Sequence, residues 1–138
     1  MGYEFLEHTA DVMFRAYGST WSEVFERAAL ATFAAMVDVD KVRAVERRII
    51  ELAAETLEEL LYAFLSELIY LKDAEGLVFS KFRVSIEGNG PYKLRAEVWG
   101  EKVRPEHNPR ADVKAITLHE MELGETDGKK YAQVVLDV

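Results

Sequence analysis

Cysteine is absent from this chain of 138 residues, and its absence removes several kinds of chemistry. Neither a disulfide nor a thiolate metal site nor a cysteine nucleophile can form. Any metal ion must therefore be held by oxygen atoms or imidazole rings, and the chain has only three histidines.

Basic residues are scarce relative to acidic ones. The chain has 17 lysines and arginines against 25 aspartates and glutamates, which gives a formal net charge of −8. Such a charge repels a polyphosphate backbone and disfavours strong, free-standing binding of nucleic acid. An acidic surface instead suits solubility, cations or a basic partner, and net charge alone does not separate these three.

Long apolar runs are also missing. No segment approaches 18 uncharged apolar residues, and residues 1–7 lack the basic and apolar regions of a secretory signal. We therefore expect a soluble, cytoplasmic protein without a membrane segment. Hydrophobic residues make up 49% and charged residues 30% of the chain, so one globular domain is expected over residues 1–138.

The hydrophobic periodicity predicts two long helices and about seven strands. Thr20 with Glu23 and Thr56 with Glu59 form capping-box signals at the two helix starts. Alternating apolar and polar residues predict extended segments, two of them at about 3–17 and the others at about 40–55, 77–87, 92–99, 116–123 and 130–138. Helices early and strands late favour the α+β class: a single two-layer domain in which one antiparallel-rich sheet packs on two helices.

Residues 8–11 (His-Thr-Ala-Asp) form the first candidate site. They place two potential ligands, His8 and Asp11, at the start of a strand. The alternative is an ordinary turn in which Thr9 and Asp11 accept hydrogen bonds from backbone amides. The local sequence supports both interpretations.

The C-terminal strand forms the second candidate site. Burial of Val134, Leu136 and Val138 on one face would fix the positions of Asp137 and of the α-carboxylate of Val138. If Asp11 lies on a neighbouring strand, three carboxylates meet. Their mutual repulsion then favours a hard divalent cation such as Ca²⁺ or Mg²⁺. Taken alone, a terminal aspartate is more often a solvated residue.

Residues 112–119 (Asp-Val-Lys-Ala-Ile-Thr-Leu-His) form the third candidate site. Lys114 can neutralise the carboxylates or reach a phosphate, and His119 can act as a ligand or proton carrier. The alternatives are a solvated lysine and a hydrogen-bonded strand histidine.

Other conspicuous residues favour structural roles. Trp21 and Trp99 suit a core or half-buried surface better than a base-stacking platform. Arg43, Arg47 and Arg48 interleave with glutamates, so their segment carries mixed charge. The sequence has no glycine-rich phosphate loop, no nucleophile elbow and no zinc-binding histidine pair at helical spacing.

Three motifs together resemble the archease family: residues 7–11 (Glu-His-Thr-Ala-Asp), residues 112–119 and residues 135–138 (Val-Leu-Asp-Val), in this order along the whole chain. The resemblance implies an α+β fold and a non-enzymatic, metal-binding cofactor protein that activates an RtcB-type RNA ligase in tRNA splicing. It implies that the activator promotes guanylylation and multiple turnover of the ligase, which itself holds Mn²⁺, GTP and RNA.

The resemblance also implies roles for individual residues. Asp11, Asp137 and the terminal carboxylate of Val138 are expected to form a Ca²⁺ site, with Mg²⁺ or Mn²⁺ as alternatives. Asp11, Lys114 and Asp137 match residues needed for ligase activation. His8 and His119 lie within the motifs as candidate secondary residues without a firm role.

Two other functions are weighed against ligase activation. In one, the protein is a chaperone or specificity modulator of a tRNA-modifying enzyme such as a tRNA methyltransferase, a role in which archease-like proteins are also implicated. In the other it is an autonomous metal-dependent hydrolase, which is disfavoured because the sequence offers no evident general base or substrate pocket.

Overall fold

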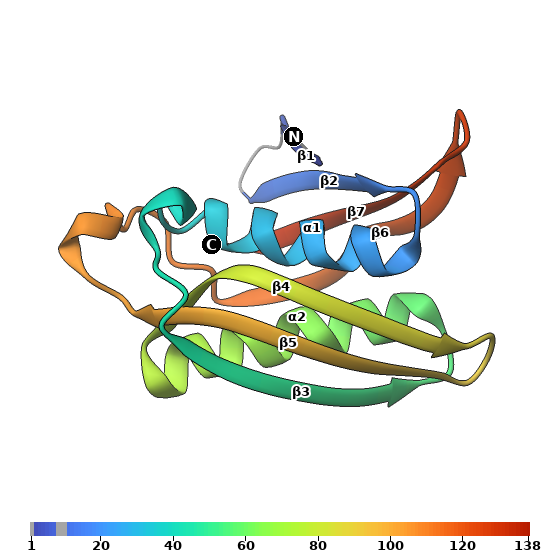
Figure 1. Ribbon diagram of the computed structural model, residues 1–138. Coiled ribbons are helices and arrows are strands. Elements are labelled where there is room, and N and C mark those ends of the chain that lie inside the picture. Colours follow the sequence, from blue (N-terminus) through green and yellow to red (C-terminus); the bar gives the residue numbers. More distant parts are fainter. Residues whose placement is uncertain (1, 8–10) are drawn as a thin grey trace.

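The computed structural model describes residues 2–7 and 11–138. Its seven strands form two antiparallel sheets, with the orders β1-β2-β7-β6 and β3-β5-β4 (Figure 1). The elements are β1 (Tyr3–Leu6), β2 (Val12–Gly18), α1 (Trp21–Ala34), η1 (Val39–Lys41), β3 (Glu46–Ala54), α2 (Leu57–Glu75), β4 (Leu77–Gly88), β5 (Tyr92–Lys102), η2 (Pro105–His107), β6 (Ala115–Thr126) and β7 (Lys129–Asp137).

Both helices begin where the capping signals place them. The side chains of Thr20 and Thr56 accept hydrogen bonds of 3.1 Å from the backbone N–H groups of Glu23 and Glu59. Each threonine thereby satisfies a backbone donor that the first helical turn leaves unpaired. The longer helix, α2, ends at Gly76, whose φ of 68° is left-handed and suits glycine.

Both helices contact both sheets. α1 packs on β2 and β7 of one sheet and on β4 of the other, whereas α2 packs on β6 and on β3, β4 and β5 (Figure 1). The fully buried Ala28, Ala29 and Ala31 give α1 a thin profile, so strands can approach it from opposite sides. These contacts build one hydrophobic core between the two sheets.

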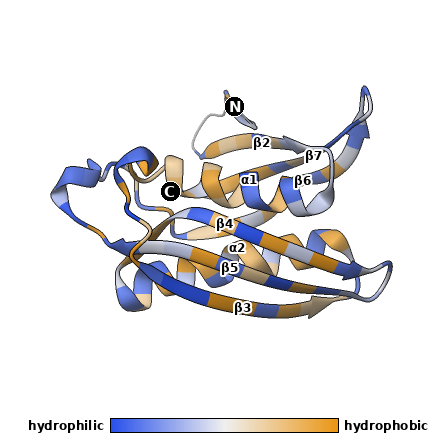
Figure 2. Cartoon of the chain, in the orientation of Figure 1, coloured by the Kyte–Doolittle hydropathy of each residue, from blue (hydrophilic) through white to orange (hydrophobic). Residues whose placement is uncertain are grey.

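The α+β class, the seven strands and the two long helices are confirmed, and the arrangement differs in one respect. The strands form two sheets and not one, because β3 pairs with β5 and does not join the sheet that contains β2. The alternation of apolar and polar residues along a strand shows which face of the strand is buried, but it does not identify the strand that pairs with it. Figure 2 shows this alternation along β3, β4 and β5, the sheet that has one covered face.

Neither helix of the described residues has the length and apolar composition needed to cross a bilayer.

Candidate functional site

Strands β2 and β7, which lie near opposite ends of the sequence, are neighbours in the four-stranded sheet. In the antiparallel pair of β2 and β7, Val12 lies opposite Leu136. Asp11 immediately precedes Val12, and Asp137 immediately follows Leu136. The two aspartates therefore come from opposite ends of the chain to the same end of neighbouring strands.

Strand β6 brings the third motif to the same place. Ala115 lies opposite Asp137, and the backbone N–H of Lys114 donates a 2.8 Å hydrogen bond to the carbonyl oxygen of Asp137. The side chain of Lys114 is exposed. We call the end of this sheet formed by Asp11, Lys114, Asp137 and Val138 the sheet tip.

The C-terminal residues are anchored by burial. Val134 and Leu136 are completely buried, as the sequence predicts, and Val138 packs partly against the same core. Because β7 is also hydrogen-bonded to a strand on each side, the position of Asp137 is fixed by the sheet. The tip is thus a defined part of the fold, in contrast to the frayed chain ends of many domains.

The carboxylates of the sheet tip are available as oxygen donors. Asp11 and Asp137 are half-buried, and their side chains make no hydrogen bond or ion pair with the other described residues. Across residues 2–7 and 11–138, no group of three or more His, Cys, Asp or Glu side chains is arranged to hold a metal. The side chains of Asp11 and Asp137 thus give two carboxylates, and the α-carboxylate of Val138 is the third carboxylate expected from the sequence. An all-oxygen set of this kind fits a hard cation.

Neither histidine of the motifs is found at the sheet tip among the described residues. His8 lies outside the described residues. His119 is 76% exposed and its Nε2 atom lies 3.5 Å from a carboxylate oxygen of Glu120. It belongs to an irregular segment of β6 between Thr117 and Glu122, so the structure does not bring His119 to the sheet tip.

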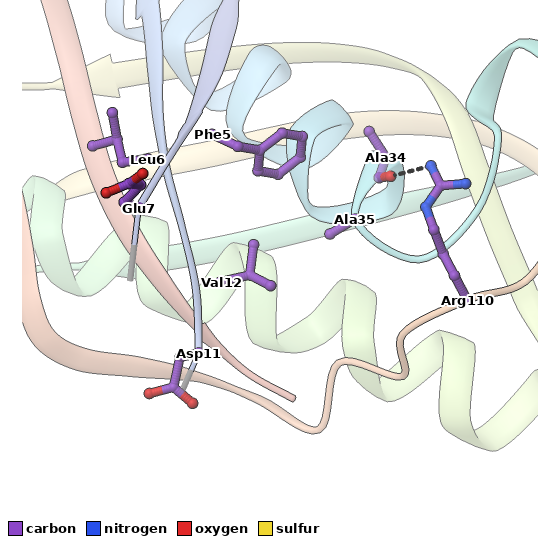
Figure 3. Close-up of a pocket in the computed structure, with 8 residues that line it drawn as sticks. All are labelled: Phe5, Leu6, Glu7, Asp11, Val12, Ala34, Ala35 and Arg110. Atoms are coloured by element: carbon purple, nitrogen blue, oxygen red, sulfur yellow. Dashed lines mark hydrogen bonds between the residues drawn. The ribbon is translucent and has the colours of Figure 1, made fainter. Parts of the chain in front are cut away.

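An open groove of about 890 Å³ adjoins the tip, and the sequence did not predict it. It lies between β1 and the end of α1, and Phe5, with 47% of its surface exposed, contributes to its wall. Figure 3 shows Asp11 at one end of the groove, with its carboxylate directed away from the Phe5 ring. At the opposite side Arg110 donates hydrogen bonds of 2.7 Å to the carbonyl oxygen of Ala34 and to a carboxylate oxygen of Asp38.

A buried polar cluster around Glu101 is a second feature that the sequence did not predict. Glu101 is 5% exposed, and its carboxylate accepts hydrogen bonds from the backbone N–H of Arg43 at 2.8 Å, from the Arg104 guanidinium at 3.2 Å and from His107 Nε2 at 3.0 Å. The hydrogen bond from the Arg43 backbone is the main cause that lowers the pKa of Glu101 to about 2. The Arg104 N–H donates to His107 Nδ1, which leaves Nε2 of this buried ring as the donor to Glu101.

This cluster has a structural role. It ties the segment that enters β3 to the polar loop after β5, and its hydrogen bonds join Glu101 to Arg43, Arg104 and His107. The sequence carried little signal for it, because glutamate at the end of a strand and histidine in a polar loop are usually exposed.

Solved structures show the same fold class. The solution structure of protein 1598 from Methanobacterium thermoautotrophicum is similar over 99% of both chains, with a TM-score of 0.88 and 43% sequence identity. A crystal structure from Thermotoga maritima, of a protein described as an archease and possible chaperone, is similar over 96% of this chain and 94% of that one, with a TM-score of 0.62 and 18% identity. At that identity the second likeness concerns the fold.

Sequence comparison then gives the family. Residues 3–138 match the profile of the Archease protein family (MTH1598/TM1083). Protein archease of Pyrococcus furiosus is 49% identical over 99% of this chain and 98% of its own length, and that of Methanosarcina mazei is 46% identical over 99% and 95%. The chain belongs to the archease family.

Proposed function

We propose that this archease is a non-enzymatic, metal-binding cofactor protein that activates an RtcB-type RNA ligase in tRNA splicing in the cytoplasm. It acts by promoting guanylylation and multiple turnover of the ligase. The observation that supports this proposal most directly is the meeting of three distant motifs at the sheet tip, where Asp11, Lys114 and Asp137 lie at the ends of neighbouring strands.

The carboxylates of the tip bind a hard cation, Ca²⁺ in the first instance, with Mg²⁺ or Mn²⁺ as alternatives. Asp11, Asp137 and the α-carboxylate of Val138 are the residues that would hold it, since oxygen ligands are the ones these cations prefer. When bound, the cation supplies positive charge that offsets the repulsion between the carboxylates. The protein's own contribution is to hold these oxygens on a rigid sheet end.

Lys114 contributes a mobile positive charge beside this site. Its backbone is fixed by the hydrogen bond to Asp137, whereas its side chain is exposed. An exposed ammonium on a fixed backbone can contact a phosphate of the partner's nucleotide. The two described histidines lie elsewhere: His107 bonds Glu101 and His119 lies beside Glu120.

The direct test is guanylylation of a purified RtcB-type ligase with GTP, measured with and without this protein and across divalent metals. Asp137→Ala is expected to abolish the stimulation while its circular dichroism spectrum and its Tm in EDTA remain those of the wild type. Asp137→Asn, which removes the charge alone, should abolish the stimulation as well, and Asp127→Asn, at the β6–β7 turn at the other end of the sheet, is its matched control. Full stimulation by Asp137→Ala would exclude the proposal.

A second candidate function is that of a chaperone or specificity modulator for a tRNA methyltransferase. The open groove with the exposed Phe5 favours it, because exposed aromatic residues in grooves are frequent contact points for protein partners. Methylation rate and site specificity of a purified methyltransferase would change on addition of the protein. Stimulation of the ligase alone would favour the first function.

A further inference from the structure

The outer face of the β3-β5-β4 sheet is basic, although the chain as a whole has a net charge of −8. The register places the alternate residues of the three strands in rows, such as Arg47 opposite Trp99 and Trp99 opposite Lys81. We call this surface the basic face. Its charged residues are the five cations Arg47, Lys81, Arg83, Lys93 and Arg95 and the three carboxylates Glu51, Glu87 and Glu97.

Three of these cations share one carboxylate. Glu97, whose side chain is 15% exposed, lies 2.9 Å from Arg47, 3.9 Å from Arg83 and 3.7 Å from Arg95. The arginine side chains are 53%, 73% and 53% exposed. A guanidinium has five N–H donors in a planar fork, so a single carboxylate leaves most of these donors, and most of the positive charge, facing solvent.

The indole ring of Trp99 lies under another cation of the basic face, Lys81. Trp99 is half-buried in the central strand β5, and the Lys81 ammonium lies 4.7 Å from the centre of its ring. The helices pack on the opposite face of this sheet through Leu94, Ala96 and Val98, which are buried. The basic face is therefore an exposed sheet surface that combines spare guanidinium donors with an indole ring.

We propose that the basic face binds the sugar–phosphate backbone of a single-stranded nucleic acid, with a base stacked against Trp99 in place of the Lys81 ammonium, a role that the sequence alone did not favour for this ring. Guanidinium forks match phosphate oxygens, and basic side chains interleaved with aromatic rings are the usual means of binding single strands without sequence preference. An acidic protein segment would match the charge but would leave the ring unused. Binding is weak and salt-dependent, because the remainder of the molecule is strongly acidic.

The proposal predicts a specific effect of charge removal. Fluorescence anisotropy of a labelled 12-nucleotide RNA, and of the same sequence as DNA, would be measured from low to physiological salt. Replacing Arg47, Arg83 and Arg95 by Gln should weaken binding at least about tenfold and reduce the salt slope by about 2, since each phosphate contact to a single strand contributes about 0.7. Unchanged affinity would overturn the proposal. The tighter-binding oligonucleotide, RNA or DNA, then shows which nucleic acid the basic face binds.

A matched control distinguishes the basic face from net charge. The variant Lys41→Gln, Lys102→Gln, Lys129→Gln removes the same charge from positions outside the face and should retain most of the binding. An equal loss in this control would show that overall charge, and not the face, governs the affinity, and would overturn the proposal.

A second variant avoids the ion pairs of Glu97. Lys81→Gln with Lys93→Gln removes two cations of the face, and neither lysine forms an ion pair with the other described residues. This variant keeps the Glu97 network, so folding is expected to persist if the triple variant unfolds. It should still lower the affinity by several-fold, whereas unchanged affinity would contradict the proposal.

Trp99 provides a reporter of stacking. The chain has two tryptophans, so Trp21→Phe leaves Trp99 as the sole indole. Added single strand should quench its fluorescence with the same midpoint as the anisotropy change. Tighter binding of a poly-glutamate peptide than of the oligonucleotides would assign the face to an acidic protein partner and overturn the proposal. Absence of quenching by both the RNA and the DNA would exclude stacking on Trp99 and would likewise overturn it.

Discussion

The backbone N–H of Lys114 donates a hydrogen bond of 2.8 Å to the carbonyl oxygen of Asp137, which joins two motifs more than twenty residues apart in sequence at one sheet end. Asp11 reaches the same end through the pairing of β2 with β7. The functional proposal depends on this arrangement, because separate motifs can act on one cation or one phosphate only if the fold holds them together.

Cation binding should stabilise the fold through the two aspartates. A ligand present at 100 times its Kd raises the free energy of unfolding by about 2.7 kcal/mol, so Ca²⁺ should raise Tm and EDTA should reverse the increase. Asp11→Asn combined with Asp137→Asn should remove this response, whereas Asp127→Asn should keep it. Differential scanning calorimetry measures both, and an undiminished Ca²⁺ response in the double variant would contradict the assigned ligands.

Lys114→Ala should remove activation of the ligase without lowering the stability of this protein. The side chain is exposed and makes no ion pair with the other described residues, and alanine retains the backbone N–H that bonds Asp137. Stability should change by no more than about 0.5 kcal/mol, while stimulation of ligase guanylylation is lost. Lys129→Ala, at the other end of the sheet, should stimulate normally. Wild-type stimulation by Lys114→Ala would refute a phosphate-contacting role.

Anchoring of the last strand should depend on Leu136. This side chain is completely buried, and truncation of a buried leucine to alanine costs about 2–5 kcal/mol. Leu136→Ala should therefore lower the urea midpoint strongly and weaken Ca²⁺ binding, because the strand that carries Asp137 loses its packing. Leu118→Ala is a control at a side chain that is 63% exposed. Equal destabilisation by the two variants would contradict the burial described here.

Acid should destabilise the protein through Glu101. Its pKa is lowered from 4.5 to about 2 in the fold, chiefly by the hydrogen bond from the Arg43 backbone. A lowered pKa means that the ionised form is stabilised; this stabilisation is complete above the unfolded-state pKa and is lost as pH falls from about 4.5 to about 2. Glu101→Gln should lower Tm at pH 7 and flatten its dependence on pH over that interval.

The matched control for this pH dependence is Glu125→Gln, whose side chain is 61% exposed. It should keep the wild-type acid profile in thermal unfolding followed by circular dichroism. A wild-type profile in Glu101→Gln would show that other carboxylates control acid unfolding.

Local signals in the sequence were sufficient for the helices and strands. Thr20 and Thr56 mark helix starts by a mechanism that involves only three following residues, and alternation of buried residues needs no knowledge of the neighbouring strand. The division into two sheets could not be predicted in this way, because the paired strands β3 and β5 are separated along the chain by α2 and β4. Strand neighbours are a property of the whole fold.

The sequence predicts the sheet tip only under two conditions that concern the fold. The sequence indicated that Asp137 would be fixed if Leu136 were buried, and that three carboxylates would meet if Asp11 lay on a neighbouring strand. The structure places β2 beside β7 and Lys114 beside Asp137. Three features depend on side chains from segments distant in sequence: the groove at Phe5, the cluster at Glu101 and the basic face. No local pattern in the sequence predicts them.

The most direct test of the proposed mechanism is a crystal of the protein grown with Ca²⁺ and measured at a wavelength where calcium scatters anomalously. One peak is expected at the sheet tip, with oxygens of Asp11, Asp137 and the Val138 α-carboxylate about 2.3–2.6 Å away. Absence of a peak there, in a protein that still stimulates the ligase, would contradict the proposed mechanism.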